Sequence, residues 1–184
     1  MADELQALQD VVGESCEILF CGINPGMMSG ATGFHFARPG NRFWKALALS
    51  GLTDRLLQPS EQALLPGFGL GITNLVARVS ATAKEVSREE LVAGGIALRS
   101  RVEQYQPSIV AVLGLGGWRI AIDRHAELGR QANLLGDATL FVLPNPSGLQ
   151  ARYQLPELAE MFAALGVTRD ELATSRATPR PAVG

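Results

Sequence analysis

The sequence predicts an α/β fold of three layers (α/β/α), in which helices flank both faces of a short, mainly four-stranded parallel sheet. Three observations support this prediction: four short apolar runs recur along the chain, segments with helical spacing separate them, and neither a repeat nor a linker interrupts the order. Such alternation is typical of a parallel sheet that is buried on both faces. We expect one domain over residues 1–170 and a disordered tail over residues 171–184, where Ser, Thr, Pro and Arg recur.

The expected strands are compact apolar runs that lead into turn-forming residues. The first, EILFCGI, has the near-continuous apolar character of a strand buried on both faces, and SIVAVLG is the clearest of the four. The strands cover residues 17–23, 69–76 and 108–114, and the fourth opens the segment 138–148 before a Pro/Gly turn.

The expected helices are identified by apolar spacing and by signals at their ends. Asn41 is a candidate N-cap for one helix. Ser87 and Glu90 have the spacing of a capping box for another, which the pair Gly94 and Gly95 weakens. The expected helices cover residues 3–10, 41–52, 87–105, 116–127 and 156–166.

Composition and charge narrow the class of protein. With 47% apolar and 18% charged residues among 184, the chain is expected to be globular, and it has no apolar run of the length that a membrane span needs. No basic segment followed by an apolar one opens the chain, so we expect a cytoplasmic protein. A net charge of −2 argues against binding nucleic acid by bulk charge alone but leaves room for a local basic face. Cys16 and Cys21 lack metal-ligand spacing, and we interpret both as reduced, buried thiols.

Polar turns follow the first and the last expected strand. The first strand ends in GINPG (residues 22–26) and the last in PNPSGL (residues 144–149), and both turns combine Gly and Pro with an asparagine. Ligands of open parallel sheets bind beyond the carboxyl ends of the strands. The sequence therefore predicts a binding site where these two turns meet at one edge of the sheet.

The two turns, together with ATGFHFARPGNRFWK (residues 31–45), resemble the signature motifs of the mismatch-specific uracil DNA glycosylases, a branch of the uracil DNA glycosylase superfamily that includes the thymine DNA glycosylases. The resemblance covers roughly residues 17–165. It implies hydrolysis of an N-glycosidic bond in double-stranded DNA, after the nucleotide has been flipped out of the duplex. The expected substrate is uracil mispaired with guanine, with thymine and damaged pyrimidines as further candidates. No metal or cofactor is implied, no lysine lies in either turn to support strand cleavage through a Schiff base, and we further expect a monomer.

The resemblance assigns the catalytic roles to Asn24 and Asn145. Asn24 would aim a water molecule at the sugar through its amide oxygen, since an amide cannot act as a strong base. Asn145, with backbone N–H groups, would stabilise the departing base as an anion. The ordinary uracil enzymes are similar but carry an aspartate and a histidine at these positions, so we expect slower chemistry here and no pH profile set by a catalytic histidine. The alternative for Asn24 is a simple turn former, and Asp54 or Glu85 is a further candidate to assist the water.

The substrate-binding roles fall on Ile23, Gly26, Ser29 and Phe36. Gly26 stands where the uracil-only enzymes place a tyrosine, and its missing side chain would leave room for a 5-methyl group; a glycine needed for backbone conformation is the alternative. Phe36 would stack on the flipped base, with an ordinary core phenylalanine as the alternative. Ile23 and Ser29 are expected to line the same pocket, although a plain loop serine is nearly as good an interpretation. His35 is interpreted as a loop residue rather than a base.

Contacts with the duplex are assigned to Gly148, Leu149, Gln150 and Arg152. Leu149 would enter the gap left by the flipped nucleotide, as apolar wedges do, and simple packing is the alternative. Backbone groups of Gly148 and Gln150 would face the widowed guanine. Arg152 lies one residue later than the arginine of the family. Further phosphate candidates, each with solvated surface charge as the alternative, are Arg38, Arg42, Lys45 and Lys84.

Two other classes of protein fit parts of the sequence. The same fold could hold damaged DNA or a nucleotide without turnover, and loss of the Asn24 side chain would then leave the bound complex unchanged. A flavodoxin-like or Rossmann-type cofactor protein could be built around Gly114–Gly117. The third glycine of G-x-G-x-x-G is missing, however, and we interpret this motif as a packing feature.

Overall fold

The computed structural model describes residues 7–149 and 152–177, and its centre is a five-stranded sheet in the order β2-β1-β3-β5-β4. Strands β2, β1, β3 and β5 are parallel, whereas the short β4 pairs with β5 in the antiparallel sense. The predicted parallel strands are confirmed, and β4 adds a short edge. The strands are β1 (Ile18–Gly22), β2 (Leu70–Asn74), β3 (Ile109–Leu113), β4 (Gly129–Arg130) and β5 (Thr139–Leu143).

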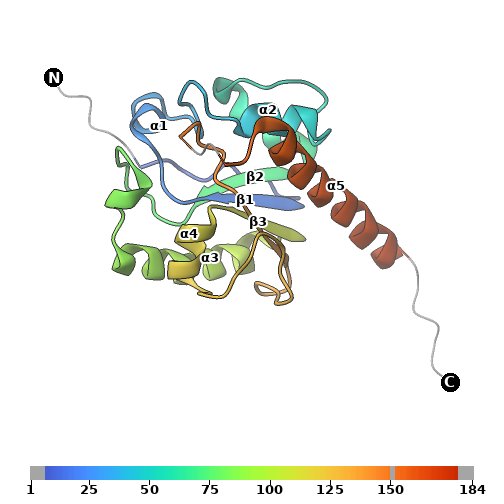
Figure 1. The fold of residues 1–184 in the computed structure, drawn as a ribbon. Coiled ribbons are helices and arrows are strands. Elements are labelled where there is room, and N and C mark those ends of the chain that lie inside the picture. The colour runs from blue at the N-terminus through green and yellow to red at the C-terminus, as the bar shows by residue number, and fades with distance from the viewer. Residues whose placement is uncertain (1–6, 150–151, 178–184) are drawn as a thin grey trace.

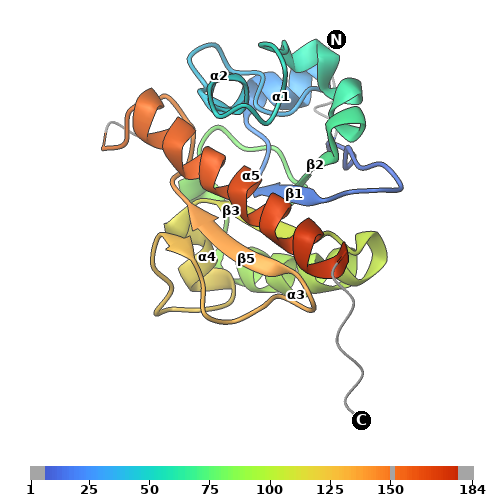
Figure 2. The same cartoon turned by 90° about the vertical axis from the view of Figure 1, so that its right-hand side faces the viewer.

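Helices cover both faces of this sheet (Figures 1 and 2). Helices α2 and α5 lie on one face and α3 and α4 on the other, so the predicted three-layer α/β/α architecture is confirmed. Among the described residues, none of the helices is both long enough and apolar enough to span a membrane. The helices are α1 (Met27–Thr32), α2 (Phe43–Leu49), α3 (Arg88–Tyr105), α4 (Leu115–Ala121) and α5 (Leu155–Ala177), with 3-10 helices η1 (Pro59–Phe68) and η2 (Ala83–Glu85).

The parallel strands are buried along their whole length and contribute to two hydrophobic cores, because successive side chains point to opposite faces of the sheet. In β1, Ile18 and Phe20 join the core beneath α2 and α5, whereas Cys21 joins the core beneath α3 and α4. Burial raises the pKa of Cys21 and of Cys16 to about 12, and both thiols are free. The interpretation of both cysteines as buried thiols is confirmed.

The strand register aligns the carboxyl ends of the parallel strands along one edge. Gly22 at the end of β1 pairs with Asn74 at the end of β2, and Leu113 of β3 pairs with Leu143 of β5. Strand β3 lies between β1 and β5, so the turns that follow these two strands start about 10 Å apart, or two strand spacings. Side chains from the two turns can therefore reach a common ligand.

The N-terminal segment differs from its prediction. A helix is expected over residues 3–10, but residues 7–10 are not helical, and the rest of that range lies outside the described residues. Instead, the backbone of Val11 pairs with Ile72 of β2 through two hydrogen bonds of 2.9 and 2.8 Å. Hydrogen bonding to the edge of the sheet is thus favoured over the helix that the weak local pattern predicted.

The C-terminal boundary is also wrong. The disordered tail is expected over residues 171–184, but α5 continues through Ala177. Leu172 packs against the core beneath α2 and α5, and this contact stabilises a helical turn that composition alone did not indicate. Residues 178–184 lie outside the described residues.

Helix α3 approaches the segment after β2 so closely that one contact requires glycine. A Cβ atom on Gly94 would lie 2.4 Å from the carbonyl oxygen of Leu75, a backbone atom that cannot move aside on its own. We therefore expect Gly94→Ala to lower the free energy of unfolding by about 1–3 kcal/mol in a urea titration. Gly116→Ala in α4 is the control, because its Cβ would meet no atom within 4 Å, and this change should be neutral or slightly stabilising. Equal stabilities for the two variants would contradict the argument.

Candidate active site

The turns after β1 and β5 open into one cavity of about 850 Å³ at the carboxyl edge of the sheet. Its walls come from the β1 turn, α1, the loop after α1, the end of β2, the segment over residues 80–84 and the β5 turn. The structure thus brings the two predicted turns together. The predicted site residues that line this cavity are Ile23, Asn24, Gly26, Ser29, Phe36, Asn145 and Leu149.

Three acceptors determine how the amide of Asn24 is oriented. Its Nδ2 donates to Ser80 Oγ at 2.7 Å, to Pro25 O at 3.1 Å and to Arg78 O at 3.2 Å. Two of these are carbonyl oxygens, which only accept, so the amide nitrogen has to face them. Among the described residues no donor contacts Oδ1 of Asn24, and this oxygen is available at the cavity. A residue that positions water by accepting a hydrogen bond requires this orientation.

Ser80 is a site residue that the sequence analysis missed. It is buried, and its Oγ donates to Thr82 O at 2.7 Å, which leaves the oxygen oriented to accept from Asn24. The segment is tied to α3 by Arg78, which bonds Glu90 at 2.7 Å and lowers the pKa of that carboxyl to about 2. No local pattern marks Ser80, because its partner Asn24 lies 56 residues away in the sequence.

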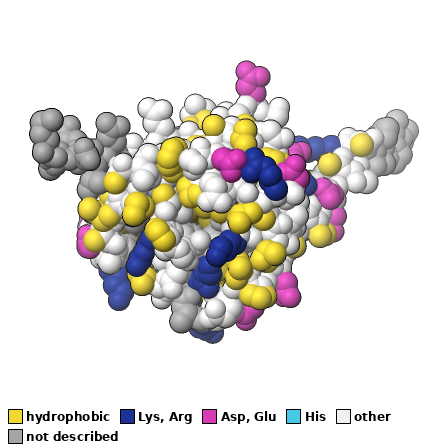
Figure 3. Space-filling model, turned by 90° about the horizontal axis from the view of Figure 1, so that it is seen from above, with side chains coloured by type: hydrophobic (Ala, Val, Ile, Leu, Met, Phe, Trp, Pro, Cys, Tyr) yellow, Lys and Arg dark blue, Asp and Glu magenta, His cyan; other side chains and the backbone are white. Residues whose placement is uncertain are grey.

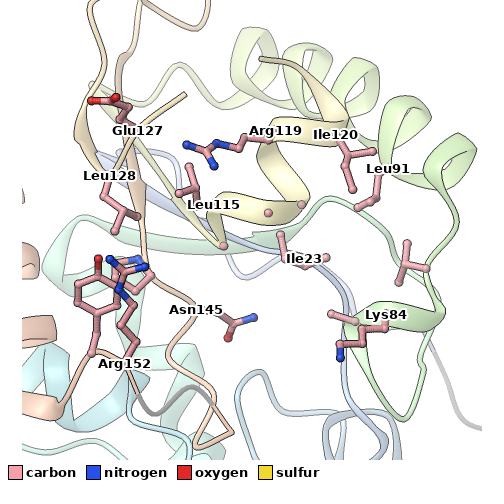
Figure 4. A pocket seen from close by; sticks show the side chains of 17 residues that line it. Ile23, Lys84, Leu91, Leu115, Arg119, Ile120, Glu127, Leu128, Asn145 and Arg152 are labelled. Carbon is pink, nitrogen blue, oxygen red and sulfur yellow. The ribbon is translucent and has the colours of Figure 1, made fainter. Parts of the chain in front are cut away.

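The amide of Asn145 has the opposite orientation to that of Asn24, because its oxygen and not its nitrogen is hydrogen-bonded to the protein. Its Oδ1 accepts from the backbone N–H of Ser147 at 2.9 Å. The oxygen therefore faces the turn, and Nδ2 is left without an acceptor among the described residues. In Figure 4 the side chain extends from the β5 turn into the open space opposite Ile23. Asn24 thus offers an acceptor, and Asn145 a donor, to the same cavity.

Gly26 leaves free space at the cavity wall. A Cβ atom here would meet nothing within 4 Å, so the predicted empty volume is present. Its φ of −80° and ψ of 170° are accessible to any residue, so the alternative of a glycine needed for backbone conformation is wrong.

Ile23 packs against Gly114 and Gly117, where a Cβ would lie 2.9 and 2.5 Å from Ile23 Cδ1. This contact explains these two glycines as packing residues.

Phe36 is held in an uncommon backbone conformation beside the cavity. Its φ of 53° lies in the left-handed region, and its ring stacks on Phe43 with centroids 4.1 Å apart. Phe36 is partly buried: it packs against the core beneath α2 and α5 and also lines the cavity, so a contact with the core and a contact with a ligand are both possible for it. Ser29 is buried, and its Oγ accepts from the N–H of Ala37 at 3.3 Å. Ser29 therefore shapes the loop that carries Phe36.

His35 and Asn74 form a buried hydrogen-bonded pair at the cavity. Nε2 of His35 lies 2.9 Å from Gln9 O, and Nδ1 lies 3.2 Å from Nδ2 of Asn74. Because the carbonyl of Gln9 only accepts, Nε2 carries the proton and Nδ1 accepts from the Asn74 amide. Asn74 therefore presents Oδ1 as an acceptor, a role that the sequence analysis missed. The signal for it was the polar end of the second strand, at the same edge as the two turns.

The neutral state of His35 predicts that stability depends on pH. Burial lowers the pKa of His35 in the folded protein, so the unfolded chain takes up a proton near pH 6.5 that the folded chain does not. The free energy of unfolding should therefore decline as the pH falls below about 6.5, and the decline should stop once the pH is below the lowered pKa of His35. Urea titrations from about pH 7.5 to about pH 5 should show this slope in the wild type and lose it in His35→Asn. An unchanged slope in the variant would assign the proton to another group.

Leu149 lies at the mouth of the cavity, where 67% of its surface is exposed. This exposure contradicts the alternative of simple packing. Gly148 lies against the backbone of Gly40, and a Cβ atom on Gly148 would lie 2.8 Å from the Gly40 carbonyl oxygen. The prediction for Gln150 falls outside the described residues.

A second cavity of about 950 Å³ adjoins the first and shares Ile23, Ala83, Lys84 and Asn145 with it (Figure 4). Arg152 lines this second cavity, and its guanidinium lies over the ring of Tyr153, 5.6 Å from the centroid. Three cations and one carboxylate on a groove continuous with the first cavity suit a phosphodiester backbone. These charged side chains are Lys84, Arg119, Arg152 and Glu127.

The other basic candidates lie in different surroundings. Arg38 lines the first cavity, Lys45 is exposed on α2, and Arg42 bonds carbonyl oxygens of the β5 turn. Figure 3, viewed over α1 and α2, shows Lys and Arg side chains intermixed with apolar ones on this face. Asp and Glu side chains lie on the same face (Figure 3), so the basic side chains placed to meet DNA are those that line the two cavities: Arg38, Lys84, Arg119 and Arg152.

Carboxylates are absent from the described lining of the first cavity. Neither Asp54 nor Glu85, the two acids considered as helpers of the water, lies there. Nor does the described part of the chain contain a group of His, Cys, Asp and Glu side chains that could hold a metal ion. The polar groups at this cavity are mainly amides and hydroxyls, which orient ligands rather than exchange protons with them. Its ionisable side chains are His35, Arg38 and Lys84.

The fold and the site together define a parallel α/β protein that presents paired amides at a cavity and cations along an adjoining groove. The chain belongs to the uracil DNA glycosylase superfamily, whose family model matches residues 10–166. The match includes both turns and the segment that carries Ser80. Membership supports uracil DNA glycosylase activity in general, with DNA as the partner.

Proposed function

We propose that this protein is a monofunctional DNA glycosylase of the mismatch-specific branch, which extrudes uracil paired with guanine and hydrolyses its N-glycosidic bond. The observation that carries the proposal is the opposed orientation of two amides: Asn24 presents an oxygen and Asn145 a nitrogen to one cavity. Hydrolysis that proceeds through a departing base anion requires one acceptor for water and one donor for the base.

The chemistry begins with the departing base. As the glycosidic bond breaks, its electron pair moves to the base, and Nδ2 of Asn145 donates a hydrogen bond to a base oxygen. The N–H of Ser147 holds this amide before substrate arrives, so little reorganisation is needed. A preorganised donor of this kind contributes about 3 kcal/mol to transition-state stabilisation.

Asn24 acts on the water. Its Oδ1 accepts one hydrogen of the water and directs the water oxygen to the sugar carbon C1′, where the hydroxyl group remains. The proton leaves to solvent or to the released base. No strong base is needed when bond breaking precedes attack, which agrees with a cavity whose described lining has no carboxylate.

Asn74 favours uracil over cytosine. Its Oδ1 can accept from N3–H of uracil, while the second hydrogen of Nδ2 donates to O4, and the bond to His35 fixes this orientation. Cytosine carries an acceptor at N3 and a donor at C4, so both contacts would be reversed. Thymine has the same edge as uracil, and the free space at Gly26 accommodates its 5-methyl group.

Phe36 and Leu149 serve extrusion. Stacking of the flipped base on an aromatic ring contributes roughly 1–3 kcal/mol, and Phe36 supplies a ring that lines the cavity. Leu149 enters the gap in the duplex as an apolar wedge, and the backbone beside it faces the widowed guanine.

The test is incubation with a duplex that holds one G·U pair, followed by alkali to cleave abasic sites. We expect cleavage above a no-enzyme control, slower cleavage for G·T, none for G·C, and no nicking without alkali. Tight, salt-dependent binding without product would instead favour a non-catalytic DNA-damage binding module.

A further inference from the structure

Arg42 links the segment that precedes α2 to the turn that follows β5. It lies just before α2, and its side chain reaches the loop over residues 144–149, here named the wedge loop. Its Nε donates to Pro146 O at 3.3 Å and its Nη2 to Ser147 O at 2.9 Å, while its backbone N–H donates to Pro146 O at 3.0 Å. Its Nη1 donates to the carbonyl oxygen of Tyr153. The planar guanidinium thus bonds the backbone on both sides of Leu149.

These bonds use the guanidinium in a way that a phosphate contact would not. A guanidinium offers five donors in a fixed fork, and here its Nε and both Nη atoms each bond a backbone carbonyl oxygen. Close contact between Gly148 and the backbone of Gly40 holds the same two loops together. Arg42 is therefore placed to order the wedge loop before DNA arrives.

We infer that Arg42 is a positioning residue, which acts through the wedge loop on duplex DNA rather than by contact with substrate. This inference rests on the proposed function. When the wedge loop is already ordered in the free protein, the entropic cost of ordering it is not added to the cost of base extrusion. In a single strand, flipping the uracil leaves no gap in a duplex for Leu149 to fill and no widowed guanine for the wedge loop to face. The effect of Arg42 is therefore confined to duplex substrates.

The experiment compares Arg42→Met and Arg42→Lys with Arg99→Met, which removes an exposed guanidinium on α3. Single-turnover rates are measured on a G·U duplex and on single-stranded DNA with one uracil. We expect both Arg42 variants to lose about tenfold or more on the duplex, and less than about threefold on the single strand. Lysine should not rescue, because its single nitrogen cannot replace the three nitrogen atoms with which the planar guanidinium reaches three carbonyl oxygens. Arg99→Met should match the wild type on both substrates.

The salt dependence of binding separates this role from a phosphate contact. Binding is measured on a G·U duplex whose uracil carries a 2′-fluoro sugar that resists cleavage. Loss of one phosphate contact reduces the slope of log K against log salt by about 0.9, whereas loss of a positioning residue leaves the slope unchanged. A reduced slope in Arg42→Met with rescue by Arg42→Lys would overturn the inference, as would equal rate losses on both substrates.

Hydrogen–deuterium exchange without DNA tests, independently of activity, whether Arg42 orders the wedge loop. In both Arg42 variants we expect faster exchange in peptides over residues 144–149 and unchanged exchange in β1 and β3. Unchanged exchange in the wedge loop refutes the inference even if the enzyme is active. A wild-type protein that yields no product refutes the proposed function, while the exchange data still decide the role of Arg42. If Arg42→Met does not fold, Arg42→Lys carries the test.

Discussion

Asn24→Ala is expected to lower the single-turnover rate of uracil release from a G·U duplex by at least about 10²-fold, with little change in binding to the uncleavable duplex. The proposed role of the Asn24 amide oxygen is to orient the attacking water, and its loss leaves the water without that hydrogen bond. The measurement is abasic-site formation under single-turnover conditions, with thermal unfolding to confirm the fold.

Ser80→Ala distinguishes this role from that of a turn former. It removes one acceptor of the Asn24 amide but leaves the contacts with Pro25 O and Arg78 O, so Oδ1 keeps its orientation. The rate should fall less than about tenfold. Asn133→Ala, at an exposed asparagine away from both cavities, controls for the substitution itself. If Ser80→Ala loses as much rate as Asn24→Ala, the amide serves the turn and not the water.

The second large effect is expected at Asn145, where two substitutions have different consequences. Asn145→Ala removes the donor to the departing base and should lower the rate by about 10²- to 10³-fold. Asn145→Asp keeps the oxygen that accepts from Ser147 N, but it replaces Nδ2 by a carboxylate oxygen. That oxygen faces a base that is becoming negative, so the rate should fall further than with alanine.

The order of these two variants is the informative result. If Asn145 only shapes the β5 turn, aspartate preserves the turn and should be close to wild type, whereas alanine is impaired. If the donor is what matters, aspartate is the slower variant. Asn133→Asp adds the same charge at an exposed position and controls for repulsion of DNA.

Much of the fold follows from local sequence. The apolar runs that end at Gly22 and Leu113 form the predicted strands, because a strand buried on both faces has to be apolar along its length. Ser87 and Glu90 form the predicted capping box of α3, since both partners lie within one turn. The α1 helix was not predicted, because its six residues carry no apolar periodicity.

The sequence by itself determined the succession of the main strands and helices along the chain, the position of the two asparagine turns and the small residue at Gly26. Only the tertiary structure decided which atoms Asn24 and Asn74 present, since Asn24 is oriented by Ser80 and Asn74 by His35. It also decided that Arg42 bonds a loop more than 100 residues away instead of facing solvent. The physical reason is the separation of the interacting residues along the sequence. Apolar periodicity involves neighbouring residues and can be recognised in the sequence, whereas a hydrogen bond between distant segments forms only after the sheet has brought them together.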